Sequence, residues 1–363
     1  MRYKNKLWIV NTILFLSLFA FLFIRVSYLF RPYSGNRANI VGYYSEPEDT
    51  IDVVFIGGSS TFVFWAPYIA WNEWGMASYD FATNSMSPAL LMGMVEEARK
   101  TQDPELFVID LRALEVRETH PDFYAEAYIR NITDSLKYSV NRIKTINYAF
   151  SYEQSGSQYN LENYLDLMMY HATWQKLNYL NFDYASNKTE QPLKGFEMAN
   201  IAYHEPFEMK DYSDITEKSA LSDSTNQILI DLLEYCKEND LNVLFTLNPF
   251  YQENEDVKKT YNYVAEVVGS YGYTFLNTND YYEEMEIDFS HDFYNRDHVN
   301  LYGAEKYTAL LGRYIVQNYS ITDHRQEAEY ISWHEGYEVW CEEAMYQKQA
   351  IDDAIAGENR QDP

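Results

Sequence analysis

The chain has 363 residues, which is enough to bury the core of one large domain or of two ordinary ones. Hydrophobic residues make up 47% of it, a share that excludes a disordered protein. Its 28 basic and 55 acidic residues give a formal net charge of −27, and such a surface repels phosphate backbones, which argues against a nucleic-acid partner.

The first predicted element is an apolar helix. Residues 7–24 (LWIVNTILFLSLFAFLFI) contain no charge, and the apolar run continues beyond Arg25. This length spans a bilayer, whereas a cleaved signal peptide, the competing interpretation, has a shorter apolar region and a small-residue cleavage site. We expect residues 1–31 to be an uncleaved anchor. Three basic residues lie on each side of it, and the free amino terminus favours a cytoplasmic N-terminus with the C-terminal domain outside the cytoplasm.

A parallel sheet is predicted after a polar linker at 32–50. Five short apolar runs have the profile of strands that are buried on both faces, and helical periodicity separates several of them. Ser87 and Pro88 are suited to the N-cap and first position of one such helix. The alternation predicts an α/β domain with helices on both faces of the sheet. The predicted strands are 51–57, 78–83, 106–111, 242–248 and 273–277.

Two further helical regions are predicted around this α/β pattern. Residues 113–222 interrupt the alternation with helically spaced apolar residues, and we expect a helical insertion in a domain that extends over 51–322. It shapes a substrate groove or partner surface, or it is a structural cap. The tail, 323–363, predicts one or two acidic helices that pack aromatic residues inward. Cys236 and Cys341 are too few for a disulfide framework and have no metal-ligand spacing, so we interpret both as structural.

The first predicted strand ends in FIGGSSTF, residues 55–62. A glycine-rich turn after a buried strand brings small residues to the carboxyl edge of a sheet, where α/β proteins bind ligands. A serine at the start of the following helix exposes its hydroxyl beside backbone N–H groups that can hold an oxyanion. The alternative is a purely structural turn with serine as the helix N-cap.

The stretch DFYNRDHVNLYGAEKYT, residues 292–308, contains one histidine, His298. This residue is a candidate catalytic base, metal ligand or polar loop residue. A metal site would combine it with Asp288, His291 and Asp292, which have no recognisable ligand spacing. We therefore expect no metal, and no cofactor, because the chain has no Walker loop, dinucleotide fingerprint or calcium loop.

Together these two stretches resemble the SGNH (GDSL-like) hydrolase superfamily. The Gly-Asp-Ser or Gly-Ser-Ser block of that family corresponds to Gly58-Ser59-Ser60, and its Asp-x-x-His block corresponds to Asn295 and His298, with Asn300 and Gly303 following. The resemblance covers roughly 51–112 and 225–315 and implies a flavodoxin-like, three-layer α/β fold. It also implies that Ser60 is the nucleophile and His298 its base.

The chain departs from the family pattern at three places. The second block has Ala82 and Thr83 where the family offers a glycine amide, and Asn84 is a candidate replacement. The third block is absent, since the third predicted strand ends in IDLR. Asn295 replaces the usual aspartate, so it orients His298 without charge, unless Asp297 or Asp292 supplies one. The predicted oxyanion and substrate-binding residues are Gly58, Ser59, Thr83, Asn84 and Asn300.

The anchor and the size resemble the membrane-attached branch of this superfamily, which includes alginate-acetylation proteins and the D-alanine-transfer protein of teichoic-acid modification. The resemblance implies a serine O-acyltransferase or esterase that acts on an envelope or exported polysaccharide. It also implies a multi-spanning membrane O-acyltransferase as partner. The alternative is a catalytically weak or inactive protein of the same fold that binds glycan or scaffolds such an acyltransferase, as Asn295 and the missing third block suggest.

Overall fold

The structure is a computed structural model, and it describes residues 2–121, 123–124, 126–152, 160–186, 189–201, 212–250 and 254–358. Its centre is a five-stranded parallel sheet with the strand order β2-β1-β3-β4-β5. All five strands lie within the predicted runs, which confirms that part of the sequence analysis. The strands are β1 (Val53–Ile56), β2 (Ser78–Asp80), β3 (Leu106–Asp110), β4 (Val243–Leu247) and β5 (Thr274–Asn277).

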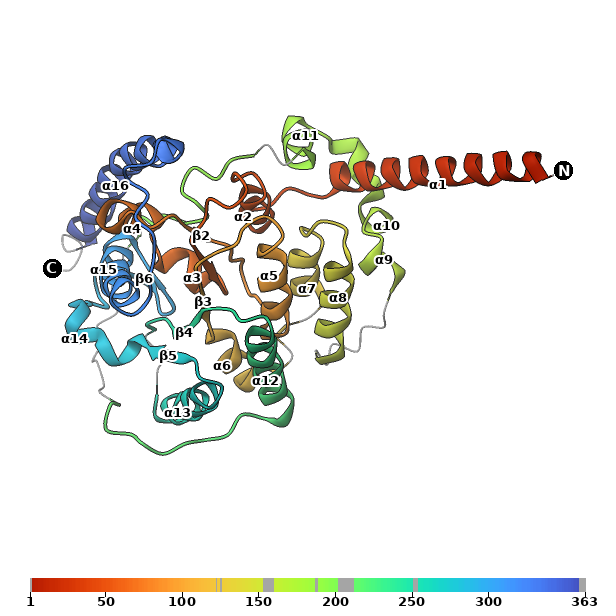
Figure 1. The fold of residues 1–363 in the computed structure, drawn as a ribbon. Coiled ribbons are helices and arrows are strands. Elements are labelled where there is room, and N and C mark those ends of the chain that lie inside the picture. Colours follow the sequence, from red (N-terminus) through yellow and green to blue (C-terminus); the bar gives the residue numbers. More distant parts are fainter. Residues whose placement is uncertain are drawn as a thin grey trace.

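Helices cover the sheet on two sides, as the alternating pattern predicts (Figure 1). One group packs together beside β1 and β2 and consists of α3 (Ser59–Phe64), α4 (Pro67–Trp74) and α15 (Leu301–Asn318). The other consists of η1 (Pro88–Leu90), α5 (Leu91–Ala98), α12 (Asp223–Glu238) and α13 (Glu255–Ser270). The Ser87 hydroxyl caps η1 by accepting from the Ala89 N–H, with Pro88 at the first position, as predicted.

The predicted linker contains a helix that packs into the body. In α2 (Gly35–Tyr43), Ile40 and Tyr43 are fully buried, and Tyr43 packs against Phe81 with ring centroids 4.3 Å apart. The interpretation of residues 32–50 as a linker was therefore wrong. Its polar appearance comes from Asn36 and Arg37, which are also buried and use their side chains in hydrogen bonds to the protein.

The predicted insertion is helical, which confirms the periodicity. Arg31 of the chain's N-terminal part forms a buried ion pair with Asp166 in this region, so the insertion is tied to the start of the chain. The helices of the insertion are α6 (Arg112–Thr119), α7 (Glu126–Thr133), α8 (Val140–Tyr152), α9 (Leu161–Tyr164), α10 (Leu167–Tyr170), η2 (His171–Lys176) and α11 (Tyr179–Ala185).

The C-terminal tail forms η4 (Ala328–Tyr330) and α16 (Ile331–Glu358), in which Tyr330, Trp333 and Trp340 pack inward as predicted, whereas Tyr346 is exposed. Trp333 is 3% exposed and its ring lies 5.3 Å from that of Trp71 in α4. Cys236 is buried in α12, and burial raises the pKa of its thiol to about 12, which agrees with a structural role. Cys341 is partly buried in α16, and neither cysteine forms a disulfide.

The N-terminal helix α1 (Arg2–Phe30) extends away from the α/β body (Figure 1). Its segment Lys6–Phe30 is long and apolar enough to cross a membrane, and side chains along it such as Leu14 and Phe15 are more than 60% exposed. An apolar surface of this kind is stable only when something other than water covers it.

Candidate functional site

The turn that follows β1 lies at the carboxyl edge of the sheet, where the strand order reverses between β1 and β3. Doubly wound sheets bind their ligands at this point. Ile56 is aligned with Ile109, so Gly57 lies beside Asp110 at the end of β3. A Cβ on Gly57 would lie 2.1 Å from Thr61 Oγ1 and 2.9 Å from Asp110 Cβ. Only glycine fits there, and it allows the chain to turn directly from β1 into α3.

Ser59, the first residue of α3, forms a hydrogen bond with His298. Ser59 Oγ lies 2.7 Å from His298 Nε2. His298 begins the second strand of a small antiparallel hairpin, formed by β6 (Phe293–Asn295) and β7 (His298–Val299). The preceding loop contains η3 (Thr278–Tyr281) and α14 (Tyr282–Met285). The hairpin brings the histidine to the serine from 239 residues away in the sequence.

Asn295 orients the imidazole ring, as predicted. Asn295 Oδ1 lies 2.9 Å from His298 Nδ1 and also accepts a hydrogen bond of 2.8 Å from the Asp297 N–H. A backbone N–H can only donate, so it identifies the bound Asn295 atom as the oxygen. His298 therefore carries its proton on Nδ1, and Nε2 is left to accept the proton of the Ser59 hydroxyl.

Ser60, the predicted nucleophile, does not contact His298. Its hydroxyl donates a hydrogen bond of 2.6 Å to Asp110 Oδ2, its side chain is buried, and its carbonyl accepts from Asn248 Nδ2. Successive side chains on a helix point about 100° apart, so Ser59 and Ser60 cannot both face the histidine. The geometry therefore corrects the predicted pairing by one residue.

Asp110 is a buried carboxyl group below the turn. Burial raises its pKa, and this outweighs the hydrogen bonds from Ser60 and from the Arg112 N–H, which lower it. Asp110 was not among the predicted site residues, although it belongs to the strand ending IDLR. The structure shows that this carboxyl group holds Ser60 away from the histidine.

Asp297 does not contact the His298 ring but forms an ion pair with Arg112. Asp297 Oδ1 lies 2.8 Å from Arg112 Nη2, and the guanidinium stacks over the Phe250 ring at 3.5 Å from its centroid. This pair joins the histidine hairpin to the end of β3. Arg112 was missed as a site residue, although its position directly after a predicted strand was a usable signal.

Asp292 and the other members of the alternative metal cluster lie apart from the histidine ring. Asp292 is fully buried and accepts hydrogen bonds from Lys306 Nζ at 2.7 Å and from the Asp288 N–H. It also lies 2.8 Å from His291 Nδ1. Within the ranges that the structure describes, no three His, Cys, Asp or Glu side chains are grouped to hold a metal ion.

Three of the predicted oxyanion or substrate-binding residues have structural contacts instead. The Thr83 N–H donates to the Gly57 carbonyl, and the Asn84 N–H donates to Asn36 Oδ1. Asn84 lines a separate cavity of about 500 Å³. Asn300 is the N-cap of α15, because its Oδ1 accepts from the N–H groups at the start of that helix. The sequence did not indicate these contacts, because short blocks do not show which amides the fold already uses.

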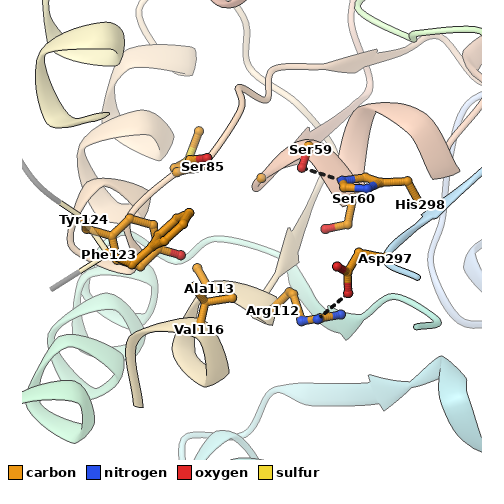
Figure 2. A pocket seen from close by; sticks show the side chains of 12 residues that line it. Ser59, Ser60, Ser85, Arg112, Ala113, Val116, Phe123, Tyr124, Asp297 and His298 are labelled. Atoms are coloured by element: carbon orange, nitrogen blue, oxygen red, sulfur yellow. Dashed lines mark hydrogen bonds and ion pairs between the residues drawn. The ribbon is translucent and has the colours of Figure 1, made fainter. Parts of the chain in front are cut away.

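Gly58, Ser59, Ser60, Asp297 and His298 line a pocket of about 240 Å³. Figure 2 shows the serine–histidine pair at one end of it and Phe123 and Tyr124 at the other. The remaining lining residues are Ser85, Met86, Arg112, Ala113 and Val116. Ser85 has a φ of 53°, a left-handed conformation that turns the chain toward the pocket. Phe123 and Tyr124 belong to the insertion, and no sequence motif marked them.

Burial lowers the pKa of His298 below its ordinary value of 6.5; Asp297 opposes this shift and Arg112 adds to it. The imidazole of His298 should therefore titrate with a midpoint below pH 6.5. Asp297→Asn removes a negative charge and should lower this midpoint, whereas Arg112→Gln leaves Asp297 unpaired and should raise it. NMR titration of the His298 imidazole in the two variants provides the measurement. Shifts in the same direction would contradict this electrostatic account.

No family model matches the chain, and no curated protein matches it.

Proposed function

We propose that this protein is a membrane-anchored serine acyltransferase or esterase of the SGNH type, with Ser59 as nucleophile, His298 as base and Asn295 as orienting residue. The proposal rests on one observation, the hydrogen-bonded series Ser59–His298–Asn295 at the carboxyl edge of the sheet. The strand order supports it, since 2-1-3-4-5 is the flavodoxin-like order. With Ser59 as nucleophile, the block of the resemblance becomes Gly57-Gly58-Ser59, and Gly58 takes the place of the family's aspartate.

The reaction follows from the positions of the protons. Ser59 Oγ attacks the carbonyl carbon of an ester while its proton moves to His298 Nε2. The negative charge on the carbonyl oxygen is held by backbone N–H groups around Gly58–Ser60. Collapse of this intermediate breaks the ester bond, and the leaving alcohol takes the proton from Nε2. Water or a sugar hydroxyl then attacks acyl-Ser59 in the reverse sequence.

The anchor favours an acceptor at the membrane or in the cell envelope. We propose that α1 crosses the cell membrane once, with the C-terminal domain outside the cytoplasm, and that the acceptor is a polysaccharide. A multi-spanning O-acyltransferase would then supply acyl groups beside the anchor. A serine-reactive fluorophosphonate tests the chemistry: an adduct on the Ser59 peptide supports it, and a folded protein without adduct contradicts it.

A catalytically weak protein of the same fold is the second candidate. Two observations favour it: the orienting residue is a neutral amide, and the Thr83 and Asn84 amides are engaged within the protein. The same labelling experiment separates the two candidates, because a glycan-binding or scaffold protein has no need of a reactive serine.

The apolar end of the pocket predicts an acyl group longer than acetyl. The pocket volume of about 240 Å³ leaves more room than the three non-hydrogen atoms of an acetyl group need, because about 10–15 Å³ of such volume already holds one water molecule. Each buried methylene contributes about 0.8 kcal/mol, so kcat/KM for p-nitrophenyl butyrate should exceed that for the acetate by about tenfold. Val116→Phe should reduce this ratio by filling the space beside Ala113 and Phe123.

Thr119→Phe provides the matched control, because Thr119 lies on the same helix, is exposed and is not among the pocket residues. It should leave the ratio unchanged. A wild-type protein that cleaves acetate faster than butyrate would contradict the predicted acyl length. The proposed catalytic residues would stand as long as Ser59 is labelled.

A further inference from the structure

The end of α1 that is nearest to the body packs against the helical insertion. The Tyr138 ring lies 6.4 Å from that of Phe23 and 5.6 Å from that of Tyr28. The backbone of the last turn is also held, since Asn181 Nδ2 donates to the carbonyls of Leu29 and Arg31. Figure 1 shows α10 and α11 beside this end of α1.

A buried ion pair fixes the direction in which α1 leaves the insertion. Arg31 Nε binds Asp166 Oδ2, and the two side chains are 3% and 0% exposed. Arg31 Nη1 also donates to the Leu136 carbonyl at 2.8 Å, and the Tyr138 hydroxyl donates to Asp166. Separating the two partners of such a pair would leave an uncompensated buried charge, so the pair resists movement of the end of α1 away from the insertion.

This packing defines the depth of the insertion relative to a bilayer. The hydrocarbon core is about 30 Å thick, and a helix rising 1.5 Å per residue crosses it in about 20 residues. Counted from Leu7, the first residue of the uncharged apolar run, the crossing ends near Val26. Phe23 lies inside that length and Arg31 lies beyond it. The contacts of the insertion with α1 therefore straddle the boundary between acyl chains and head groups.

The insertion exposes large apolar side chains at this level. Trp174 and Tyr179 are 62% and 73% exposed, and Met168 and Met169 about half exposed. Residues 167–182 contain no acid and one base, Lys176, in a chain with 55 acids. Tryptophan and tyrosine are enriched where a protein crosses the head-group region. We call these exposed residues the anchor-side patch: Leu161, Met168, Met169, Trp174, Tyr179 and Phe182.

We propose that the anchor-side patch lies in the head-group region of the same bilayer that α1 crosses. The occupant of the surface is lipid, because α1 holds α10 and α11 at the depth where lipid is the surrounding medium. The absence of acids between 167 and 182 keeps the strongly acidic surface of the protein away from anionic head groups. The inference rests on α1 as the membrane span and not on the proposed chemistry.

Spin labels on the full chain in phosphatidylcholine–phosphatidylglycerol vesicles test the proposal. The labels are placed by Met169→Cys and Trp174→Cys, and Met345→Cys is the matched control. All three are made with Cys341→Ser, so that Cys341 is not labelled, and Cys236 is kept because it is buried. Met345 is 68% exposed, but it lies on α16, far from α1 in Figure 1. Leu14→Cys marks the apolar span. The measured quantity is the accessibility of each label to oxygen and to a water-soluble nickel complex.

The labels at 169 and 174 should lie about 5–10 Å inside the head-group boundary, as expected for an interfacial helix. They should favour oxygen over nickel, the label at 345 should favour nickel, and the label at 14 should lie deepest. Labels at 169 and 174 that are as open to nickel as the one at 345 would overturn the proposal and leave a protein partner as the occupant. A water-exposed label at 14 would also overturn it, because α1 would then not be the span.

Discussion

Ser59→Ala is expected to abolish covalent labelling by a fluorophosphonate and to lower ester cleavage by at least about 10⁴-fold, as loss of a catalytic serine does elsewhere. The reason is geometric, since the Ser59 hydroxyl is the group that lies 2.7 Å from His298 Nε2. Mass spectrometry of the labelled full chain, with the adduct located by peptide, gives the measurement. His298→Ala should also prevent labelling, because the proton of Ser59 then has no acceptor.

Ser60→Ala is the matched control for this prediction. It removes the hydrogen bond to Asp110 and leaves a buried carboxyl group with one donor fewer. We expect the free energy of unfolding to fall by about 1–3 kcal/mol while the Ser59 peptide is still labelled. Ser60 would be the nucleophile if the adduct were on Ser60, or if labelling survived in Ser59→Ala and disappeared in Ser60→Ala.

Asn295→Asp is expected to raise hydrolysis of a simple ester by roughly one to two orders of magnitude. Asn295 Oδ1 already accepts the Nδ1–H bond of His298, so a carboxylate there keeps the tautomer and adds the charge that stabilises an imidazolium. A factor of ten corresponds to about 1.4 kcal/mol of transition-state stabilisation. In serine proteases, changing the aspartate that orients the catalytic histidine to asparagine lowers kcat by about 10⁴. We expect less here, because the Asp297 N–H bond to residue 295 already fixes the loop.

Steady-state kcat and kcat/KM with p-nitrophenyl butyrate measure this effect. Asn295→Ala is the comparison and should lower kcat, because the ring then loses its partner at Nδ1. The two nearby aspartates are engaged elsewhere, Asp297 with Arg112 and Asp292 with Lys306. If Asn295→Asp changed nothing while Asp297→Ala or Asp292→Ala removed activity, the charged orienting group would be one of those aspartates.

The elements of the fold could be predicted from local patterns. A strand buried on both faces needs an unbroken apolar run, and VVFI and LFVID are such runs, so their positions follow from composition alone. The apolar helix is equally local. Residues 32–50 were mistaken for a linker, since polar side chains such as Arg37 give no local sign of their buried partners in α1 and the following turn.

In the candidate site too, some contacts are local in sequence and others depend on the tertiary structure. His298 and Asn295 lie in one hairpin and were predicted together, because three residues of sequence place them side by side. The choice between Ser59 and Ser60 depends on the rotation of α3 about its axis. That rotation is determined by Gly57 closing onto Thr61, four residues further along, and by Asp110, which binds Ser60 from 50 residues away.

The sequence by itself therefore determined the apolar span, the five strands, the helical insertion and the pairing of Asn295 with His298, since each depends on neighbouring residues. Only the tertiary structure decided that Ser59 faces His298, that Arg112 pairs with Asp297 and that the Thr83 and Asn84 amides are already used. It also decided that the insertion lies against the end of α1 through Arg31 and Asp166. The physical reason is that hydrogen bonds and ion pairs are formed at about 3 Å between atoms whose separation along the chain is unrelated to their distance in space.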